Sequence, residues 1–213
     1  MLKYEQVSYN INGAKIINDI SMNFRKKELV AIVGENGAGK TTLFNILYHR
    51  KKVSGGNVYI NNTNIKKIDN NTFYQNVVML SQDPKQCLFE GLTLKEHIIL
   101  YKNDAFHTSI KQIEQYLNFI LLEKINLTVD SLSGGQRQTF AFALTMLKSP
   151  QILLLDEHTS ALDANAAEHM MQITKEVVIN KSIVGLMISH NIELTKKYAD
   201  RVILVANGKI SFI

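Results

Sequence analysis

A length of 213 residues is enough to bury one domain core, and 46% hydrophobic with 20% charged residues excludes a disordered or low-complexity chain. The net charge of +5 comes from short basic groups such as Arg25-Lys26-Lys27 and Lys196-Lys197, which are typical of solvated faces, so no nucleic-acid partner is expected. Cys87 is the only cysteine, which excludes an intrachain disulfide and fits a reducing compartment. No run approaches about 18 apolar residues and no signal-peptide core is present, so a cytosolic chain is predicted.

The first part of the chain predicts strands around a turn. Residues 2–9 alternate in polarity, the Asn12-Gly13 pair indicates a turn, and residues 16–24 repeat the strand pattern. Residues 29–33 are short, β-branched and uncharged, which predicts a buried strand, and residues 43–48 carry apolar side chains at helical spacing.

A glycine-rich loop joins that buried strand to the helix. Residues 34–41 read Gly-Glu-Asn-Gly-Ala-Gly-Lys-Thr, which fits the pattern G-x-x-x-x-G-K-[ST]. The glycines let backbone N–H groups approach an anion, the helix N-terminus and Lys40 add positive charge, and Thr41 offers a hydroxyl to Mg²⁺. The loop therefore predicts binding of a nucleoside triphosphate.

The middle of the chain changes character. We expect a break at residues 54–57, short strands at 58–60 and 77–80, and a loop at 81–84. From about residue 92 to residue 148 the apolar residues keep helical spacing, beginning with the capping-box pair Thr93 and Glu96. This stretch predicts a helical lobe inserted into an α/β domain.

After Pro150 strands and helices alternate again. Residues 152–155 and 182–188 predict buried strands, 164–178 and 192–198 predict helices, and 202–213 predict a closing hairpin around Asn207-Gly208. This alternation favours a mostly parallel sheet that binds ligands at the carboxyl ends of its strands.

Two further features carry chemistry. Asp156 and Glu157 directly follow a buried strand, where one carboxylate can hold Mg²⁺ and the other can orient or deprotonate an attacking water. Ser133 is a good N-cap for a second helix, and Gly134 and Gly135 expose backbone N–H groups at its positive end. The chain thus has two helix N-termini suited to anions.

Over essentially its full length the chain resembles the ATP-binding subunit of an ATP-binding cassette (ABC) transporter. The family motifs match as follows: residues 34–41, the Walker A loop; Gln82, the Q-loop glutamine; residues 132–136, the LSGGQ signature; residues 152–156, Walker B; Glu157, the catalytic glutamate; residues 160–163, the D-loop; His190, the switch histidine; Tyr9, the aromatic residue that stacks on adenine.

The resemblance implies a fold. It is a single α/β P-loop NTPase domain over residues 1–213, with a mostly parallel sheet core, an N-terminal antiparallel β subdomain and an inserted α-helical lobe. Residues 1–84 and 150–213 form the core with its β subdomain, and residues 85–149 form the helical lobe that includes the signature.

The resemblance also implies ATP and Mg²⁺ as ligands, with Glu157 and His190 as catalytic residues and Thr41, Gln82 and Asp156 around the metal. The implied nucleotide contacts are Tyr9, Gly34, Glu35, Asn36, Gly37, Ala38, Gly39, Lys40, Thr41, Thr42, Gln82, Ser133, Gly134, Gly135 and Gln136. In this family two cassettes pack head to tail, as a homodimer or heterodimer, and each ATP lies between Walker A of one chain and the signature of the other. The subunits dock on a transmembrane permease at the inner face of the cell membrane.

One departure concerns the residue after the catalytic glutamate, which is usually proline in the family and is His158 here. The run Asp156-Glu157-His158-Thr159 resembles a subgroup of bacterial importers, some linked to binding proteins proposed to carry aromatic amino acids. By itself His158 reads as a neutral loop substitution. The preferred function is an ATPase that energises an importer of a small solute, with a solute-binding protein as a further partner. An exporter or lipoprotein-release ATPase, and a soluble ATPase such as one for iron–sulfur assembly, stay open as alternatives.

Overall fold

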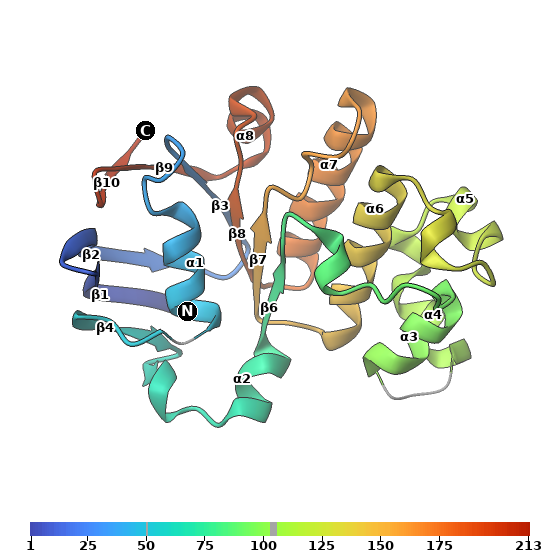
Figure 1. The fold of residues 1–213 in the computed structure, drawn as a ribbon, viewed down its shortest axis with the longest axis horizontal. Coiled ribbons are helices and arrows are strands. Elements are labelled where there is room, and N and C mark those ends of the chain that lie inside the picture. Colours follow the sequence, from blue (N-terminus) through green and yellow to red (C-terminus); the bar gives the residue numbers. More distant parts are fainter. Residues whose placement is uncertain (50, 103–105) are drawn as a thin grey trace.

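The computed structural model describes residues 1–49, 51–102 and 106–213, and its strands there form two sheets. The larger sheet has the strand order β10-β9-β3-β8-β7-β6, and the smaller has the order β2-β1-β4-β5 (Figure 1). The larger sheet contains β3 (Glu28–Val33), β6 (Val77–Leu80), β7 (Ile152–Asp156), β8 (Val184–Ile188), β9 (Arg201–Ala206) and β10 (Lys209–Phe212). The smaller contains β1 (Leu2–Ile11), β2 (Ala14–Phe24), β4 (Gly55–Ile60) and β5 (Thr63–Asn64).

Strands β6, β7, β8, β3 and β9 are parallel, and only β10 runs antiparallel to its neighbour. All pairings within the smaller sheet are antiparallel. The expected fold class is therefore confirmed: a mostly parallel core sheet accompanied by an N-terminal antiparallel sheet. Parallel strands end at one edge, so the loops after β3, β6, β7 and β8 lie together.

The helices cover both faces of the larger sheet. They are α1 (Lys40–Tyr48), α2 (Asn70–Asn76), α3 (Leu94–Lys102), α4 (Phe106–Ile113), α5 (Phe119–Glu123), α6 (Gly134–Thr145), α7 (Ala164–Asn180) and α8 (Ile192–Tyr198). Strand β7 shows how the sheet divides the core, because Ile152 and Leu154 pack with α1 and the smaller sheet while Leu153 and Leu155 pack with α6 and α7. Residues on alternate faces of a strand are buried in different clusters, which is why this strand reads as continuously apolar.

Three sequence expectations differ from the structure. Residues 54–57 were expected to break the chain, but Gly55 to Asn57 begin β4, and Gly56 takes a φ of 74° where its Cα faces the backbone of Gln6. The region from residue 92 to 148 is helical as expected, but α3, α4 and α5 are short and 3₁₀ turns follow α4 and α6. Helix α2 was not predicted. The remaining predicted strands and helices are confirmed to within a few residues at each end.

Candidate nucleotide site

The glycine-rich loop lies between β3 and α1, as predicted. Gly34 has a φ of 148°, and a Cβ atom there would lie 2.2 Å from the backbone oxygen of Val205 in β9. Gly39, the N-cap of α1, has a φ of 105°, and a Cβ there would lie 2.9 Å from Ile17 Cδ1. These two positions require glycine because neither the conformation nor the space accepts a side chain.

Lys40 is 6% exposed, which is unusual for a lysine. Its ammonium donates hydrogen bonds to the carbonyl oxygens of Gly34, at 2.7 Å, and Glu35, at 2.9 Å. These bonds hold a full positive charge inside the curve of the loop, next to the N-terminus of α1. The first turn of α1 contains no acidic residue, so the positive end of this helix is not neutralised locally.

Glu157 occupies the centre of the strand-end region. Its carboxylate accepts a hydrogen bond from Gln82 Nε2 at 2.8 Å and lies 3.0 Å from His190 Nε2. The three residues follow β7, β6 and β8, whose carboxyl ends meet at one edge of the sheet. The fold thus brings together three residues that the sequence analysis placed in the site from separate motifs.

The backbone of Glu157 is held in an uncommon conformation. Its φ is 51°, a left-handed value that costs a non-glycine residue about 1–2 kcal/mol. Its N–H donates to the carbonyl oxygen of Ile188 in β8 at 3.0 Å, and its carbonyl accepts from Ser160 N–H at 3.0 Å. The surrounding hydrogen bonds therefore maintain a turn that aims the carboxylate at Gln82 and His190.

Asp156 ends β7 beside this group. Burial raises the pKa of its carboxyl, Glu157 raises it further, and Lys40 and His190 oppose the rise. Asp156, Thr41 and Gln82 line a single cavity of about 740 Å³. A carboxylate, a hydroxyl and an amide oxygen are oxygen ligands of the type that Mg²⁺ accepts together with substrate phosphates, so the donor set fits that ion. Among the described residues no cluster of three His, Cys, Asp or Glu side chains forms a metal site, so a cation here would depend on these mixed oxygen donors.

The second helix N-terminus belongs to α6. Ser133 accepts from Gln136 N–H at 3.3 Å, and Gln136 Oε1 accepts from Ser133 N–H at 3.1 Å, which completes a capping box. A Cβ at Gly135 would lie 3.0 Å from Leu162 Cδ2, so this glycine lets α6 approach the segment after Glu157 closely. Figure 1 places the N-termini of α1 and α6 on the same face of the molecule but apart, on different sides of β7 and β8. Within one chain, therefore, the two helix ends that were expected to bind anions do not share a site.

The aromatic residue expected to stack on adenine, Tyr9, is half-buried in β1 opposite Ile17 and packs against the core cluster of the smaller sheet. A cavity of about 470 Å³ lies beside the glycine-rich loop, and Tyr9 does not line it. Its lining residues are Lys15, Ile16, Glu35, Asn36, Gly37, Ala38, Leu204, Val205, Ala206, Asn207 and Gly208. Lys15 and Ile16 belong to no sequence motif, and only the tertiary fold places the start of β2 beside residues 35–38.

His158, which by itself was interpreted as a neutral loop substitution, is 2% exposed and therefore buried. Its Nε2 lies 3.1 Å from the hydroxyl of Thr174 in α7, and its ring stacks on Phe142 of α6 at 6.4 Å between centroids. Burial lowers its pKa to about 4, so the ring is neutral near pH 7. No local signal in the run Asp-Glu-His-Thr reveals this burial.

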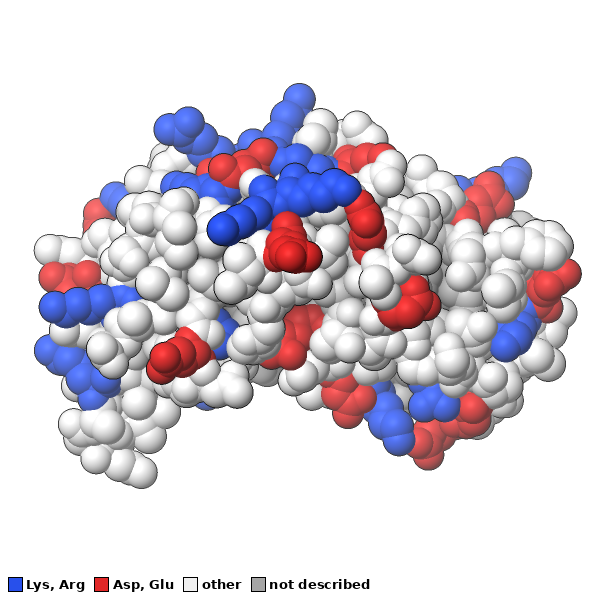
Figure 2. Space-filling model, turned by 90° about the horizontal axis from the view of Figure 1, so that it is seen from above, with Lys and Arg blue, Asp and Glu red and all other residues white. Residues whose placement is uncertain are grey.

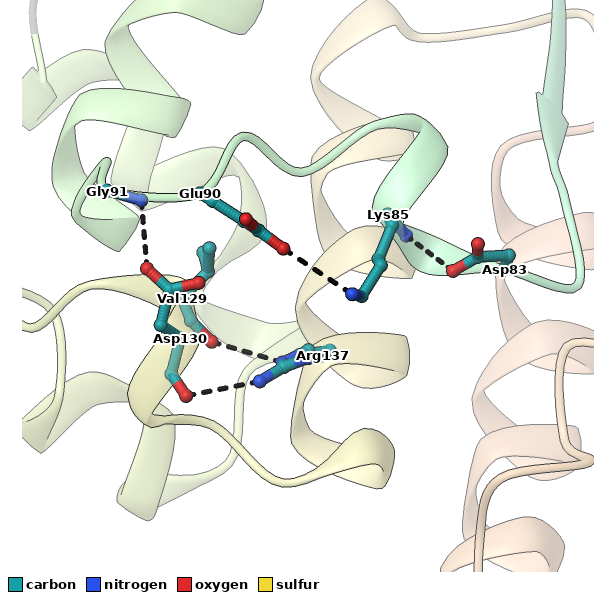
Figure 3. A network of polar contacts seen from close by, with 7 residues as sticks. All are labelled: Asp83, Lys85, Glu90, Gly91, Val129, Asp130 and Arg137. Atoms are coloured by element: carbon teal, nitrogen blue, oxygen red, sulfur yellow. Dashed lines mark hydrogen bonds and ion pairs between the residues drawn. The ribbon is translucent and has the colours of Figure 1, made fainter.

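A polar network joins the segment after Gln82 to the segment before the signature (Figure 3). Asp130 Oδ2 accepts from Gly91 N–H at 2.8 Å, and Arg137 donates to the carbonyl oxygens of Val129 and Asp130 at 3.2 and 3.1 Å. Lys85 pairs with Glu90 at 3.4 Å along the same segment. The segment that follows Gln82 is thus connected, through residues 129 and 130, to Arg137 near the start of α6.

Charges on the face that lies at the top of Figure 1 are mixed in sign. Figure 2 shows basic and acidic side chains next to one another on this face. Such alternation is typical of a solvated surface.

Comparison with known proteins supports the family that the motifs suggested. A family model described as ABC transporter matches residues 17–160, a span that includes the glycine-rich loop, the capped helix α6 and Glu157. The chain belongs to the ABC transporter family. The expected family and its activity are confirmed: this ABC protein is an ATP-binding and ATP-hydrolysing subunit that energises transport.

Individual relatives agree with this assignment. The tyrosine transport ATP-binding protein of Clostridioides difficile is 32% identical over 92% of this chain and 82% of its own length. The arginine transport ATP-binding protein ArtM of Bacillus subtilis is 32% identical over 99% of this chain and 89% of its own.

Solved structures share the fold. CbiO1 of Clostridium perfringens, part of an ABC transporter complex, superimposes with a TM-score of 0.88 at 25% identity over 99% of this chain and 86% of that chain. An ATP-binding cassette solved as a dimer with ADP and Pi gives a TM-score of 0.83 at 24% identity, over 99% of this chain and 97% of that one. In the described part of this ABC chain no helix is long and apolar enough to cross a membrane.

Proposed function

We propose that this chain hydrolyses ATP through Glu157 and thereby drives an importer of a small solute, with an amino acid as the favoured class. The observation that carries the proposal is the position of the Glu157 carboxylate between Gln82 Nε2 and His190 Nε2, at 2.8 and 3.0 Å. A carboxylate held by two polar side chains at the strand ends is placed to orient and deprotonate a water. The tyrosine and arginine transport proteins among its relatives favour an amino acid as the solute.

The proposed residue roles combine the family resemblance with the geometry of the site. Backbone N–H groups of residues 34–42 and the Lys40 ammonium bind the phosphate chain, which concentrates positive charge where the transferred phosphoryl group becomes more negative. His190 contacts the γ-phosphate. Thr41, Gln82 and Asp156 hold Mg²⁺, which neutralises phosphate charge when it is bound. Tyr9 contacts adenine from the strand β1.

The site is completed by a second ATPase subunit. The N-terminus of α6, which carries Ser133, Gly134 and Gly135, lies on the face that bears the loop ends, yet apart from the glycine-rich loop of the same chain (Figure 1). A head-to-tail dimer places them on the γ-phosphate held by the partner chain. Each chain then contributes to two ATP sites.

The partner in the membrane is a permease that docks on the cavity beside Gln82. That cavity extends from Asp156 and Thr41 to Phe89 and Leu100, whose side chains are 59% and 60% exposed. A permease segment bound to this exposed apolar end senses movements of the loop that carries Gln82. In this proposal the chain lies at the inner face of the cell membrane, and a solute-binding protein is the remaining importer component.

The proposal is tested with Glu157→Gln, which keeps the shape of the side chain and the hydrogen bond to Gln82 but removes the base. We expect ATP binding to stay within about twofold of the wild type and turnover to fall by about two orders of magnitude or more, since a general base contributes about 10²–10⁴ in rate. The variant is also expected to accumulate as an ATP-bound dimer in size-exclusion chromatography. Unchanged ATPase activity in Glu157→Gln rules out the assigned role. Glu123→Gln, an exposed glutamate at the end of α5, is the matched control and is expected to retain wild-type turnover.

A further inference from the structure

His158 lies where the catalytic turn meets two helices. It follows Glu157 directly, and its side chain is 2% exposed although the turn itself leaves the edge of the sheet. A histidine ring needs a polar partner when it is removed from water, because an unpaired buried polar group costs about 1–3 kcal/mol. The contacts of the His158 ring therefore indicate its role.

The polar contact is to α7. Nε2 of His158 lies 3.1 Å from Thr174 Oγ1, and Thr174 is itself fully buried in the middle of that helix. This hydrogen bond links a turn of irregular backbone to a rigid 17-residue helix. A side chain fixed in this way restrains the backbone of the preceding residue, which is Glu157.

The ring contact is to α6. The imidazole stacks on the ring of Phe142 with an angle of 25° between their planes. Phe142 lies about two turns along the helix that begins at Gly134, so a displacement of that helix end is transmitted to Phe142 through hydrogen-bonded backbone. His158 thus touches the helix whose N-terminus is proposed to bind the partner's nucleotide.

Glu157 needs such restraint. Its left-handed φ of 51° is a conformation that persists only where the surroundings maintain it. Two backbone hydrogen bonds, to Ile188 and from Ser160, hold the main chain of this residue. His158 supplies the side-chain anchor next to it.

We propose that His158 is a positioning residue for ATP hydrolysis. It fixes the Glu157 carboxylate through its hydrogen bond to Thr174, and through Phe142 it makes the position of that carboxylate depend on how α6 is seated. In the dimer this contact connects the catalytic group of one ATP site to the signature residues of the other. The inference rests on the proposed function, because it assumes that Glu157 activates the water.

The hydrogen bond is tested by ATPase kinetics of Thr174→Val, which removes the hydroxyl while keeping the size of the side chain. We expect kcat to fall by about tenfold with the KM for ATP within about twofold of the wild type, since a small misplacement of a catalytic group lowers the rate of chemistry more than binding. Thr174→Ser, which keeps the hydroxyl, is expected to restore kcat to within about twofold.

The matched control is Thr195→Val. Thr195 is equally buried, but it belongs to α8, and its hydroxyl has no hydrogen-bond partner among the described residues. This variant is expected to keep wild-type kcat well below its melting temperature, whereas a general effect of replacing a buried threonine would lower kcat in both variants. The inference is overturned if Thr174→Val keeps wild-type kcat, or if Thr195→Val loses as much kcat as Thr174→Val.

The link to α6 is tested by a double-mutant cycle between His158→Gln and Phe142→Leu. If the ring contact carries the effect, Phe142→Leu lowers kcat in the wild type but has little further effect once His158 is replaced. Independent effects that multiply in the double variant overturn the link to α6. If Glu157→Gln instead keeps the ATPase activity of the wild type, the proposed function itself is refuted. The failure of the inference and the failure of the proposed function are therefore distinguishable.

Discussion

Gly34 and Gly13 both have positive φ values, but their surroundings differ. A Cβ at Gly34 would lie 2.2 Å from the Val205 carbonyl oxygen, whereas a Cβ at Gly13 meets nothing within 4 Å. We expect Gly34→Ala to lower the free energy of unfolding by roughly 3 kcal/mol, because a backbone contact this short forces the strand or the loop to move. Urea denaturation measures the loss.

The matched variant is Gly13→Ala, in an exposed turn of the smaller sheet. It meets only the conformational penalty of a left-handed residue, about 1 kcal/mol. Equal losses in the two variants would contradict the role of the close approach to β9.

The lowered pKa of His158 predicts that the free energy of unfolding depends on pH. Its pKa is lowered from 6.5 to about 4 in the folded chain, so between these values the unfolded chain binds a proton that the folded chain does not. The contribution of this residue to the free energy of unfolding therefore decreases as pH falls, and at pH 5 it is about 2 kcal/mol lower than at pH 8. Urea denaturation at both pH values compares the wild type with His158→Gln. We expect the variant to lose less stability on acidification, and an equal loss in both proteins would refute the prediction.

Helices α3 and α6 both begin with a capping box, but they lie in different parts of the molecule. Thr93 and Glu96 exchange hydrogen bonds at the start of α3, with Thr93 N–H donating to Glu96 at 2.7 Å, and Ser133 with Gln136 does the same at the start of α6. Both caps stabilise a helix end. Only the α6 cap lies at the end proposed to bind a nucleotide.

We therefore expect Thr93→Ala and Ser133→Ala each to lower the free energy of unfolding by about 1 kcal/mol. Thr93→Ala is expected to keep wild-type ATPase activity well below its melting temperature, whereas Ser133→Ala loses most of it because a phosphate ligand is removed. Chemical denaturation and steady-state ATPase assays measure the two quantities separately. Equal activity in the two variants would contradict the assignment of Ser133.

The elements that could be predicted are those with a strong local pattern. Residues 29–33 and 152–155 are uninterrupted apolar runs, and α8 was predicted at its observed bounds, from Ile192 to Tyr198. Helix α2 was missed because its sequence, Asn-Asn-Thr-Phe-Tyr-Gln-Asn, has weak helix formers and only Phe73 is buried. The start of β4 was missed because two successive glycines indicate a break, and only the paired strand β1 explains why glycine is tolerated there.

The candidate site could be predicted in part for the same reason. The glycine-rich loop, Asp156 with Glu157 and the cap at Ser133 have local patterns. The contacts of Glu157 with Gln82 and His190 depend on the order β8-β7-β6 in the sheet, which no local pattern contains. The burial of His158 likewise depends on α6 and α7, which reach it from both sides.

At the scale of the whole molecule, the two regions that the proposal assigns to an ATP site lie apart. The loop around Lys40 and the helix end at Ser133 lie on one face, separated by the strands β7 and β8 (Figure 1). If each half is completed by a second copy, the activity per chain rises with chain concentration. Variants defective in different halves are then able to complement one another.

We expect Lys40→Ala and Ser133→Ala to be nearly inactive alone and to regain about one quarter of wild-type activity when mixed in equal amounts. A head-to-tail pair of the two variants contains one site with both defects and one intact site, and about half of the dimers are such mixed pairs. Steady-state ATPase assays of the mixture measure the gain. A mixture as inactive as its components would contradict the head-to-tail arrangement.

The left-handed backbone of Glu157 also bears on how the sequence can change. Glycine adopts that conformation without strain, so folding alone favours glycine at position 157, while the proposed mechanism requires a carboxylate there. A laboratory selection that rewards only thermal resistance or expression will therefore tend to discard the residue to which we assign the activation of water. Libraries built to stabilise this protein should hold position 157 fixed and draw their gains from surfaces remote from the strand ends.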